Sequence, residues 1–354
     1  MSDLFDYKKE MSELRFTENQ KKTLAEAAAS AAGKTAKRRR PVFRTALIAA
    51  VLVMALAVGS SAAGVLPSPA ELFAPLFGGA VAQTEVIDKI GRPIGAGDSD
   101  NGITITADAI MGDRYNAVIV YTIRRDDGER FLPEGKIPDG SYLMMGGFGG
   151  SVWSRSGGHG SAWFVDEDPD DDRVQYVEAM SVTDEPLTHA NATAEFENLT
   201  YWDPEAEAEA TLYEGHWKFR YEVDFEDCGV SLGGGETFSQ DGLNFTIDEI
   251  SVSPIAVRAA YTVDKAAVWS DSPSGRLPEE DARESARFAE NVEILLTKTD
   301  GTVVDLTNSG SSISADAEQD VSRCTKGQVF DEIIPLEDMA SISVGGVVYD
   351  IPRG

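Results

Sequence analysis

The chain has 354 residues, room for two or three ordinary domains, and a hydrophobic content of 42% that can form real cores. Its net charge of −29 argues against nucleic acid as a partner, because the phosphates would be repelled. The charge is divided unevenly: residues 1–44 hold 11 Lys and Arg against 6 Asp and Glu, whereas the rest of the chain holds 20 against 54. This division suggests that the two segments face different solvents.

Residues 1–44 form a predicted cytoplasmic helical segment. Apolar residues spaced three, four and three apart form one stripe on a helix: Leu4, Tyr7, Met11 and Leu14. A second short helix is predicted to follow, up to about Ala32. Helices this short cannot bury their own apolar faces, so we expect the stripe to bind a groove on a partner. The alternative is a loose tail that only carries the topology signal.

Residues 45–66 are predicted to span a membrane. This run carries no charge, and as a helix it would be about 33 Å long, near the thickness of the hydrocarbon layer. A core helix of a soluble domain and a signal peptide cleaved near Ser61-Ala62-Ala63 are the alternatives, but the long segment before it is unlike the short leader of a signal peptide. Six basic residues between Lys34 and Arg44 predict a cytoplasmic N-terminus and an extracytoplasmic remainder in the cell membrane.

Residues 67–96 are predicted to form a stalk with two short helices. The first is expected near Ala70 to Phe77, within a stretch rich in Pro and Gly. The second is expected within residues 84–95 and to stop at Gly91 and Pro93. Strand patterns dominate from there to the C-terminus.

An internal repeat is the clearest organisational feature of the remaining chain. The stretch from Asn101 to Ile123 aligns without gaps with the stretch from Asp241 to Val263, with six identities. Each copy begins with a turn residue and a Gly and continues as two segments that alternate apolar and polar residues, which predicts a β-hairpin. Chance could produce part of this similarity, but the shared register of both segments favours duplication.

Further turn signals indicate a mainly β fold. Asp300-Gly301 and Gly345-Gly346 each separate two short strand patterns, as in hairpins, and one helix is expected near Pro278 to Asn291. Short strands broken by turns favour two tandem immunoglobulin-like β-sandwich domains, which we place at residues 97–228 and 229–354.

The sequence predicts no enzyme, no cofactor and no metal. It lacks a nucleophile elbow, a Walker loop and a zinc-protease motif. The acidic stretch at residues 166–172 could attract calcium, but it lacks the Gly and the distal Glu of a calcium loop, so a solvated acidic turn is favoured.

The two cysteines, Cys228 and Cys324, both lie on the predicted outer side. In an oxidising compartment they could form a disulfide, which would close a loop of about 95 residues. Two unpaired buried thiols are the alternative.

The order of these segments resembles a bacterial family of single-pass membrane proteins that regulate extracytoplasmic-function sigma factors and whose ectodomain begins with a domain of unknown function. The motifs that carry the resemblance are the passage from Gly91-Arg92-Pro93-Ile94 to Ile103, the strand with Gly215-His216-Trp217 and the turn Ser253-Pro254-Ile255. The resemblance implies that the cytoplasmic helices hold a sigma factor until an envelope signal arrives. Residues 1–44 lack the His- and Cys-rich zinc-binding motif of anti-sigma factors.

These observations together predict an anti-sigma-factor-like membrane regulator. Its expected partners are the lipid bilayer, a cytoplasmic sigma factor and an envelope or extracellular ligand. The alternative is an extracytoplasmic adhesion or cell-wall-binding module that one transmembrane helix anchors.

Overall fold

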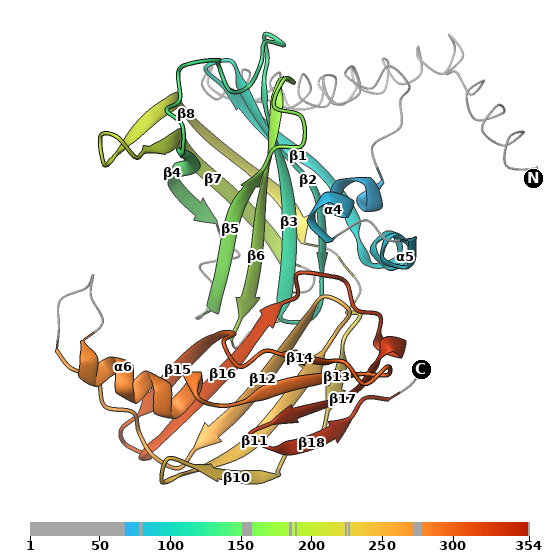
Figure 1. Cartoon of the computed structure of the whole chain (residues 1–354), viewed down its shortest axis with the longest axis vertical. Coiled ribbons are helices and arrows are strands. Elements are labelled where there is room, and N and C mark those ends of the chain that lie inside the picture. The colour runs from blue at the N-terminus through green and yellow to red at the C-terminus, as the bar shows by residue number, and fades with distance from the viewer. Residues whose placement is uncertain are drawn as a thin grey trace, which may run out of the picture. The chain divides into compact units, whose positions relative to one another are not determined.

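The computed structural model describes residues 68–77, 81–150, 158–183, 186–187, 190–223, 225, 227–271 and 278–352 (Figure 1). They all belong to one compact unit, Pro67–Gly354. The predicted cytoplasmic segment and the predicted span at residues 45–66 lie outside the described residues. Among the helices that are described, none is long and apolar enough to cross a membrane. The predicted mainly β class is confirmed, whereas immunoglobulin-like topology stays a prediction.

The first half of the described chain is a sandwich of two antiparallel sheets. The larger sheet has five strands, in the order β1 (Arg92–Asp100), β2 (Ile103–Gly112), β3 (Asn116–Arg125), β6 (Arg173–Val182) and β5 (Gly158–Val165). The smaller sheet has three strands, in the order β4 (Tyr142–Gly150), β7 (Ala190–Asp203) and β8 (Ala208–Val223). Alternate residues of the facing strands fill the core between the sheets, among them Ile105, Ile119 and Trp217.

Both faces of the five-stranded sheet are buried. The face away from the sandwich core carries Met111, Val118, Val120 and Val177, which are fully shielded from solvent. Side chains of α4 (Pro69–Phe77) and α5 (Val81–Ile90) cover this face and share one apolar cluster with it. The segment predicted as a stalk therefore belongs to the folded unit, because its helices supply the apolar side chains that this face needs.

A capping box fixes the start of α4. The hydroxyl of Ser68 accepts a hydrogen bond from the backbone N–H of Glu71 at 3.2 Å, and the Glu71 carboxylate accepts one from the Ser68 N–H at 2.9 Å. Pro69 stands at the first helical position, where its missing N–H costs nothing. Further support comes from α5, because the Asp88 carboxylate accepts from the Ala70 N–H at 3.1 Å.

The second half of the described chain is another two-sheet sandwich. Its larger sheet contains β10 (Thr237–Gln240), β11 (Leu243–Val252), β12 (Ala256–Val263), β16 (Val321–Val329) and β15 (Gly310–Asp316), with β9 (Val230–Leu232) beside β11. Its smaller sheet contains β14 (Val303–Asp305), β13 (Ile294–Lys298), β17 (Met339–Val344) and β18 (Val347–Asp350). The predicted helix near Pro278 is present as α6 (Glu279–Ser285), and the π-helix η1 (Ala286–Glu290) continues it. The 3-10 turn η2 (Leu336–Asp338) precedes β17.

The two sandwiches repeat one topology. The order β1-β2-β3-β6-β5 corresponds to β10-β11-β12-β16-β15, and β4-β7-β8 corresponds to β13-β17-β18, so that β14 is an addition. Left-handed residues precede both predicted hairpins, in the β1–β2 and β10–β11 turns, with φ of 48° at Asn101 and 52° at Asp241. The predicted repeat is thus confirmed as a structural one and extends well beyond the two aligned stretches.

The hairpins share even their irregularities. The β2–β3 register shifts between Ala107 and Ala109, and the β11–β12 register shifts between Ile247 and Glu249, which are the positions that the repeat aligns with them. The residue in the first bulge, Asp108, accepts a hydrogen bond from the hydroxyl of Thr122 at 2.5 Å. Its counterpart Asp248 accepts one from Thr262 at 2.8 Å.

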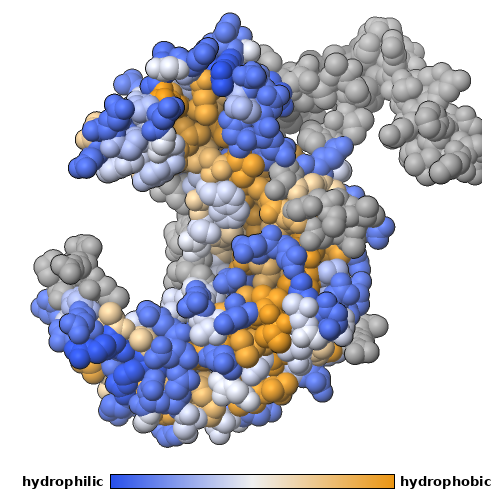
Figure 2. All heavy atoms as spheres, in the orientation of Figure 1, coloured by the Kyte–Doolittle hydropathy of each residue, from blue (hydrophilic) through white to orange (hydrophobic). Residues whose placement is uncertain are grey.

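The sandwich cores differ at one pair of equivalent positions. Glu178 lies opposite Ile119 on β3, and Lys326 lies opposite Ala259 on β12, the residue that the repeat aligns with Ile119. Both charged side chains are buried. On the surface, Figure 2 shows hydrophobic residues along the middle of the face on view and hydrophilic residues over its margins.

Candidate functional site at the junction of the two sandwiches

Two equivalent turns meet where the sandwiches join. In the β2–β3 turn the Asp113 carboxylate accepts hydrogen bonds from the backbone N–H groups of Tyr115 and Asn116, both at 2.9 Å. In the β11–β12 turn the Ser253 hydroxyl oxygen accepts from the N–H groups two and three residues later, at 3.3 and 3.1 Å. Asp113 and Ser253 are therefore matching caps at the same place in the two copies of the turn.

The two caps bind each other. The Ser253 hydroxyl donates to Oδ2 of Asp113 at 2.5 Å, and both residues are buried, with 0% and 1% of their surface exposed. Burial raises the pKa of the Asp113 carboxyl, and its hydrogen bond from Ser253 is the largest influence in the opposite direction. Because the Asp113 carboxylate accepts hydrogen bonds from several donors, the free-energy cost of burying it is offset within the junction.

A cationic side chain strengthens the junction beside these caps. The guanidinium of Arg258, on β12, lies 4.0 Å from the centre of the Tyr115 ring and donates to the Thr183 carbonyl at 2.5 Å. It also lies 3.7 Å from the carboxylate of Glu249, which accepts from the Tyr115 hydroxyl at 3.2 Å. Charged and aromatic groups of both sandwiches therefore form one network.

Apolar side chains close the junction on the side of the helices. The cluster that holds Phe73 of α4 and Ile87 of α5 also contains Ile255, Ala256 and Ile333 of the second sandwich. Equivalent strands touch here as well, since β6 contacts β16 and β5 contacts β15. The two helices thus share one apolar cluster with residues of both sandwiches.

Cys228 and Cys324 are free thiols in the structure. Cys228 packs against the apolar cluster of the junction and donates to the Gly112 carbonyl at 3.3 Å, whereas Cys324 lies in the core of the second sandwich. Burial raises the pKa of each thiol to about 12. Both are therefore poor nucleophiles and behave as small core residues.

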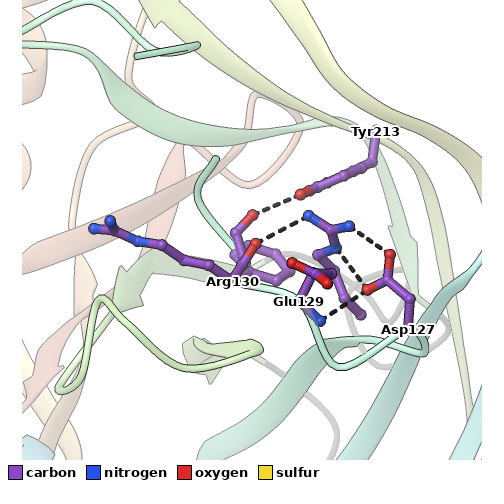
Figure 3. Close-up of polar contacts among 6 residues, drawn as sticks. Asp127, Glu129, Arg130 and Tyr213 are labelled. Carbon is purple, nitrogen blue, oxygen red and sulfur yellow. Dashed lines mark hydrogen bonds and ion pairs between the residues drawn. The ribbon is translucent and has the colours of Figure 1, made fainter. Parts of the chain in front are cut away.

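The acidic stretch at residues 166–172 is tied to the loop that follows β3. The Phe131 N–H donates to the Asp171 carbonyl at 2.8 Å, and Arg130 binds both the Pro169 carbonyl and the Asp170 carboxylate. Figure 3 shows the Arg130 guanidinium pointing away from Asp127 and Tyr213. Within the described ranges, no three His, Cys, Asp or Glu side chains are grouped so that they could hold a metal ion.

A second cluster holds the same loop from inside. Arg125 donates to both carboxylate oxygens of Asp127 and to the Arg130 carbonyl, and the Tyr213 hydroxyl donates to the Phe131 carbonyl at 2.5 Å (Figure 3). The hydrogen bonds that Asp127 accepts from Arg125, the main cause, and from the Glu129 N–H hold its pKa below the usual value. The polar groups of this cluster are thus used to fix a loop.

The predicted stripe Leu4, Tyr7, Met11 and Leu14 lies outside the described residues. Sequence reasoning also missed the junction, although the repeat contains its signal: Asp113 and Ser253 are turn-forming residues at the same place in each copy. What the sequence cannot show is that the two turns face each other.

Comparison with known proteins adds little. No family model and no curated protein matches the chain. Among solved structures, it is similar to one described as the crystal structure of the conserved domain protein from Bacillus anthracis, at 14% identity and a TM-score of 0.40. The match covers 70% of this chain and 73% of the other.

Proposed function

We propose that the protein is a single-pass membrane regulator, similar to anti-sigma factors, whose extracytoplasmic sandwiches control a cytoplasmic helical segment. The observation that carries this proposal is the uncharged run at residues 45–66, with six basic residues on its N-terminal side. The cytoplasmic stripe would cover surfaces that a sigma factor needs to bind polymerase, and the tether would keep the complex at the membrane.

The junction offers a physical route for the signal. Helix α4 begins at Pro69, shortly after the predicted span ends at Leu66, and its side chains belong to an apolar cluster that holds residues of both sandwiches. A ligand that binds one arrangement of the sandwiches more tightly than another would shift the equilibrium toward that arrangement, by as much as the two affinities differ. The packing around α4 would change with it. The span would pass the shift to the stripe.

Membrane topology is tested first. A reporter that is active only outside the cytoplasm, fused at the C-terminus, should be active, and the full-length protein should fractionate with membranes. Activity of a cytoplasm-only reporter at that position would contradict the proposal.

Partner capture is tested with the detergent-solubilised full-length protein. We expect it to retain a sigma factor, and Tyr7→Asp or Met11→Asp to weaken that retention because each puts a charge on the apolar stripe. Ser12→Asp adds the same charge off the stripe and is the matched control. Unchanged retention in both stripe variants would show that the stripe is not the contact. A correct topology with no sigma factor retained would favour the adhesion or cell-wall-binding alternative.

A further inference from the structure

The free edges of two strands approach each other along one side of the first sandwich. β1 is the last strand of the larger sheet, and β8 is the last strand of the smaller one. Side chains of β1 bridge the gap: the Asp98 carboxylate accepts from the Lys218 N–H at 3.0 Å, and the Asp100 carboxylate accepts from the His216 N–H at 2.9 Å. Carboxylates at alternate residues of an extended segment thus bind alternate N–H groups of β8.

This ladder of carboxylates ends toward the start of β1. The β1–β2 register shifts between Pro93 and Ala96, around Gly95 with φ of 70°. The residues that continue the alternation of Asp100 and Asp98 are Ala96 and Ile94, which have no acceptor in their side chains. The edge of β8 therefore extends past the last carboxylate that β1 supplies.

A cavity of about 460 Å³ lies at that place. Its walls come from the start of β1, from Ile110 of β2, from Asn191 of β7, and from Arg220, Tyr221 and Glu222 of β8. Strand β8 pairs with β7 without a break from His216 to Val223, so the N–H groups of Arg220 and Glu222 leave the strand on the same side as those of His216 and Lys218. They face the cavity, and the volume suits a short peptide or small ligand.

Charge favours an anionic occupant. Two arginines, Arg92 and Arg220, are among the lining residues against one acidic residue, Glu222, in a chain whose net charge is −29. Arg92 is held in place by bonds from its Nη1 to the carbonyls of Lys89 and Gly91, at 2.9 and 3.0 Å. Guanidinium groups bind carboxylates strongly and with defined geometry.

We propose that this cavity binds an extended peptide segment whose carboxylates stand at alternate residues, so that the ligand continues the ladder that Asp98 and Asp100 begin. Backbone N–H groups of β8 and the guanidinium of Arg220 hold its carboxylates, while Ile94, Ala96 and Ile110 contact its apolar residues. The free edge of β8 would thus bind an extended segment through its side-chain carboxylates, as it binds Asp98 and Asp100 of β1. The proposal does not depend on the membrane topology or on sigma-factor binding.

The test uses the full-length protein in detergent and a fluorescent peptide, Ac-Val-Asp-Val-Asp-Val-NH2, with the matched peptide in which both Asp residues are Asn. We expect the acidic peptide to bind and the Asn peptide to bind at least about ten-fold more weakly. Arg220→Gln should weaken the acidic peptide by about ten-fold, because it removes a charge-assisted hydrogen bond. Arg323→Gln removes an exposed arginine of the second sandwich and should leave binding unchanged.

Three results would overturn the proposal. One is no binding of the acidic peptide, and another is equal binding of the two peptides. The third is equal loss in Arg220→Gln and Arg323→Gln, which would mean that only overall charge matters. Sodium succinate is the competitor that separates a peptide from a small dicarboxylate: full displacement at equal concentration would show that the site reads two carboxylates and no extended backbone.

Discussion

At the scale of single residues, Lys326 shows how the second sandwich accommodates a buried cation. Its ammonium donates to the backbone carbonyls of Ala289, Glu290 and Val292, at 2.7 to 2.8 Å, and so caps the C-terminal end of η1. A cation at that end also complements the helix dipole. Burial lowers the pKa of Lys326 to about 8. Glu178, its counterpart, instead accepts from the Tyr121 hydroxyl at 3.1 Å.

Lys326→Met tests the importance of that cap. The substitution leaves three carbonyls without their donor in a buried place, so we expect the free energy of unfolding to fall by about 3 kcal/mol. Urea denaturation followed by tryptophan fluorescence measures it. Lys265→Met is the matched control, because Lys265 pairs with Asp320 at an exposed site and should cost less than about 1 kcal/mol. Equal losses in the two variants would contradict the role given to Lys326.

Asp108 predicts a pH dependence of stability. Burial raises its pKa from 3.8 to about 7, although the Thr122 hydroxyl opposes this change and part of the residue still contacts solvent. The folded protein therefore holds this proton more tightly than the unfolded chain does. Its contribution to stability is complete below about pH 4 and is lost as the pH rises through 7.

Replacement by Asn should remove this contribution. In urea titrations at pH 5 and pH 8, Asp108→Asn is expected to lose less stability at the higher pH than the unsubstituted protein does. Asp248→Asn makes the same change at the equivalent, exposed position, where Thr262 also donates to the side chain, and is the matched control. If the pH dependence of the two variants is the same, Asp108 is not its source.

At the scale of elements, local patterns predicted the hairpins well. A turn residue, Asn101 or Asp241, marks the start of each copy. The alternation of apolar and polar residues then indicates the strands, because burial of one face fixes the register. The turns at Asp300-Gly301 and Gly345-Gly346 also join the strands that the sequence indicates. The two short helices predicted within residues 67–96 are present as α4 and α5, but their sequence pattern does not indicate which sheet face they cover. In the structure, alternate residues of β2, β3 and β6 are apolar on both faces of the sheet, and the helices cover the face away from the sandwich core.

Gly91 tests how closely the two helices approach. A Cβ at this position would lie 2.6 Å from Cβ of Pro69 and 2.8 Å from the Ile87 carbonyl oxygen. Gly91→Ala should therefore displace the start of α4, at a cost of about 1–3 kcal/mol. Faster amide exchange in α4 is the expected measurement. Gly233→Ala, where a Cβ meets nothing within 4 Å, is the control, and equal exchange in the two variants would argue against the close approach.

At the scale of the whole folded unit, the junction joins two copies through corresponding parts. Turn meets turn through Asp113 and Ser253, and strand meets strand through β6 with β16. The sequence predicted two tandem β-domains and their duplication, because both follow from local periodicity. It could not predict the junction, since contacts between residues so far apart along the chain depend on how the finished sandwiches fit together.

A double-mutant cycle measures this contact. Asp113→Asn keeps an acceptor for the turn N–H groups, and Ser253→Ala removes the hydroxyl that donates across the junction. We expect a coupling of about 1–3 kcal/mol between them, as for a buried hydrogen bond to a charged group. Asp98→Asn combined with Ser253→Ala is the control pair, because Asp98 bonds to Lys218 within the first sandwich, and it should be additive. A coupling no larger than in the control pair would show that the junction is not energetically linked.

The opposite charges of Glu178 and Lys326 have a consequence for how a newly made chain sorts its two similar halves. Both halves emerge from the ribosome with hairpins of matching register, and each hairpin could recruit the third strand of the other. If β16 joined β3, the Lys326 ammonium would enter a core that lacks the end of η1 and would be buried without the three carbonyls that it binds in its own half. We therefore expect Lys326 to disfavour this exchange, whereas Glu178 on β12 would meet Tyr261 at the position that the repeat aligns with Tyr121.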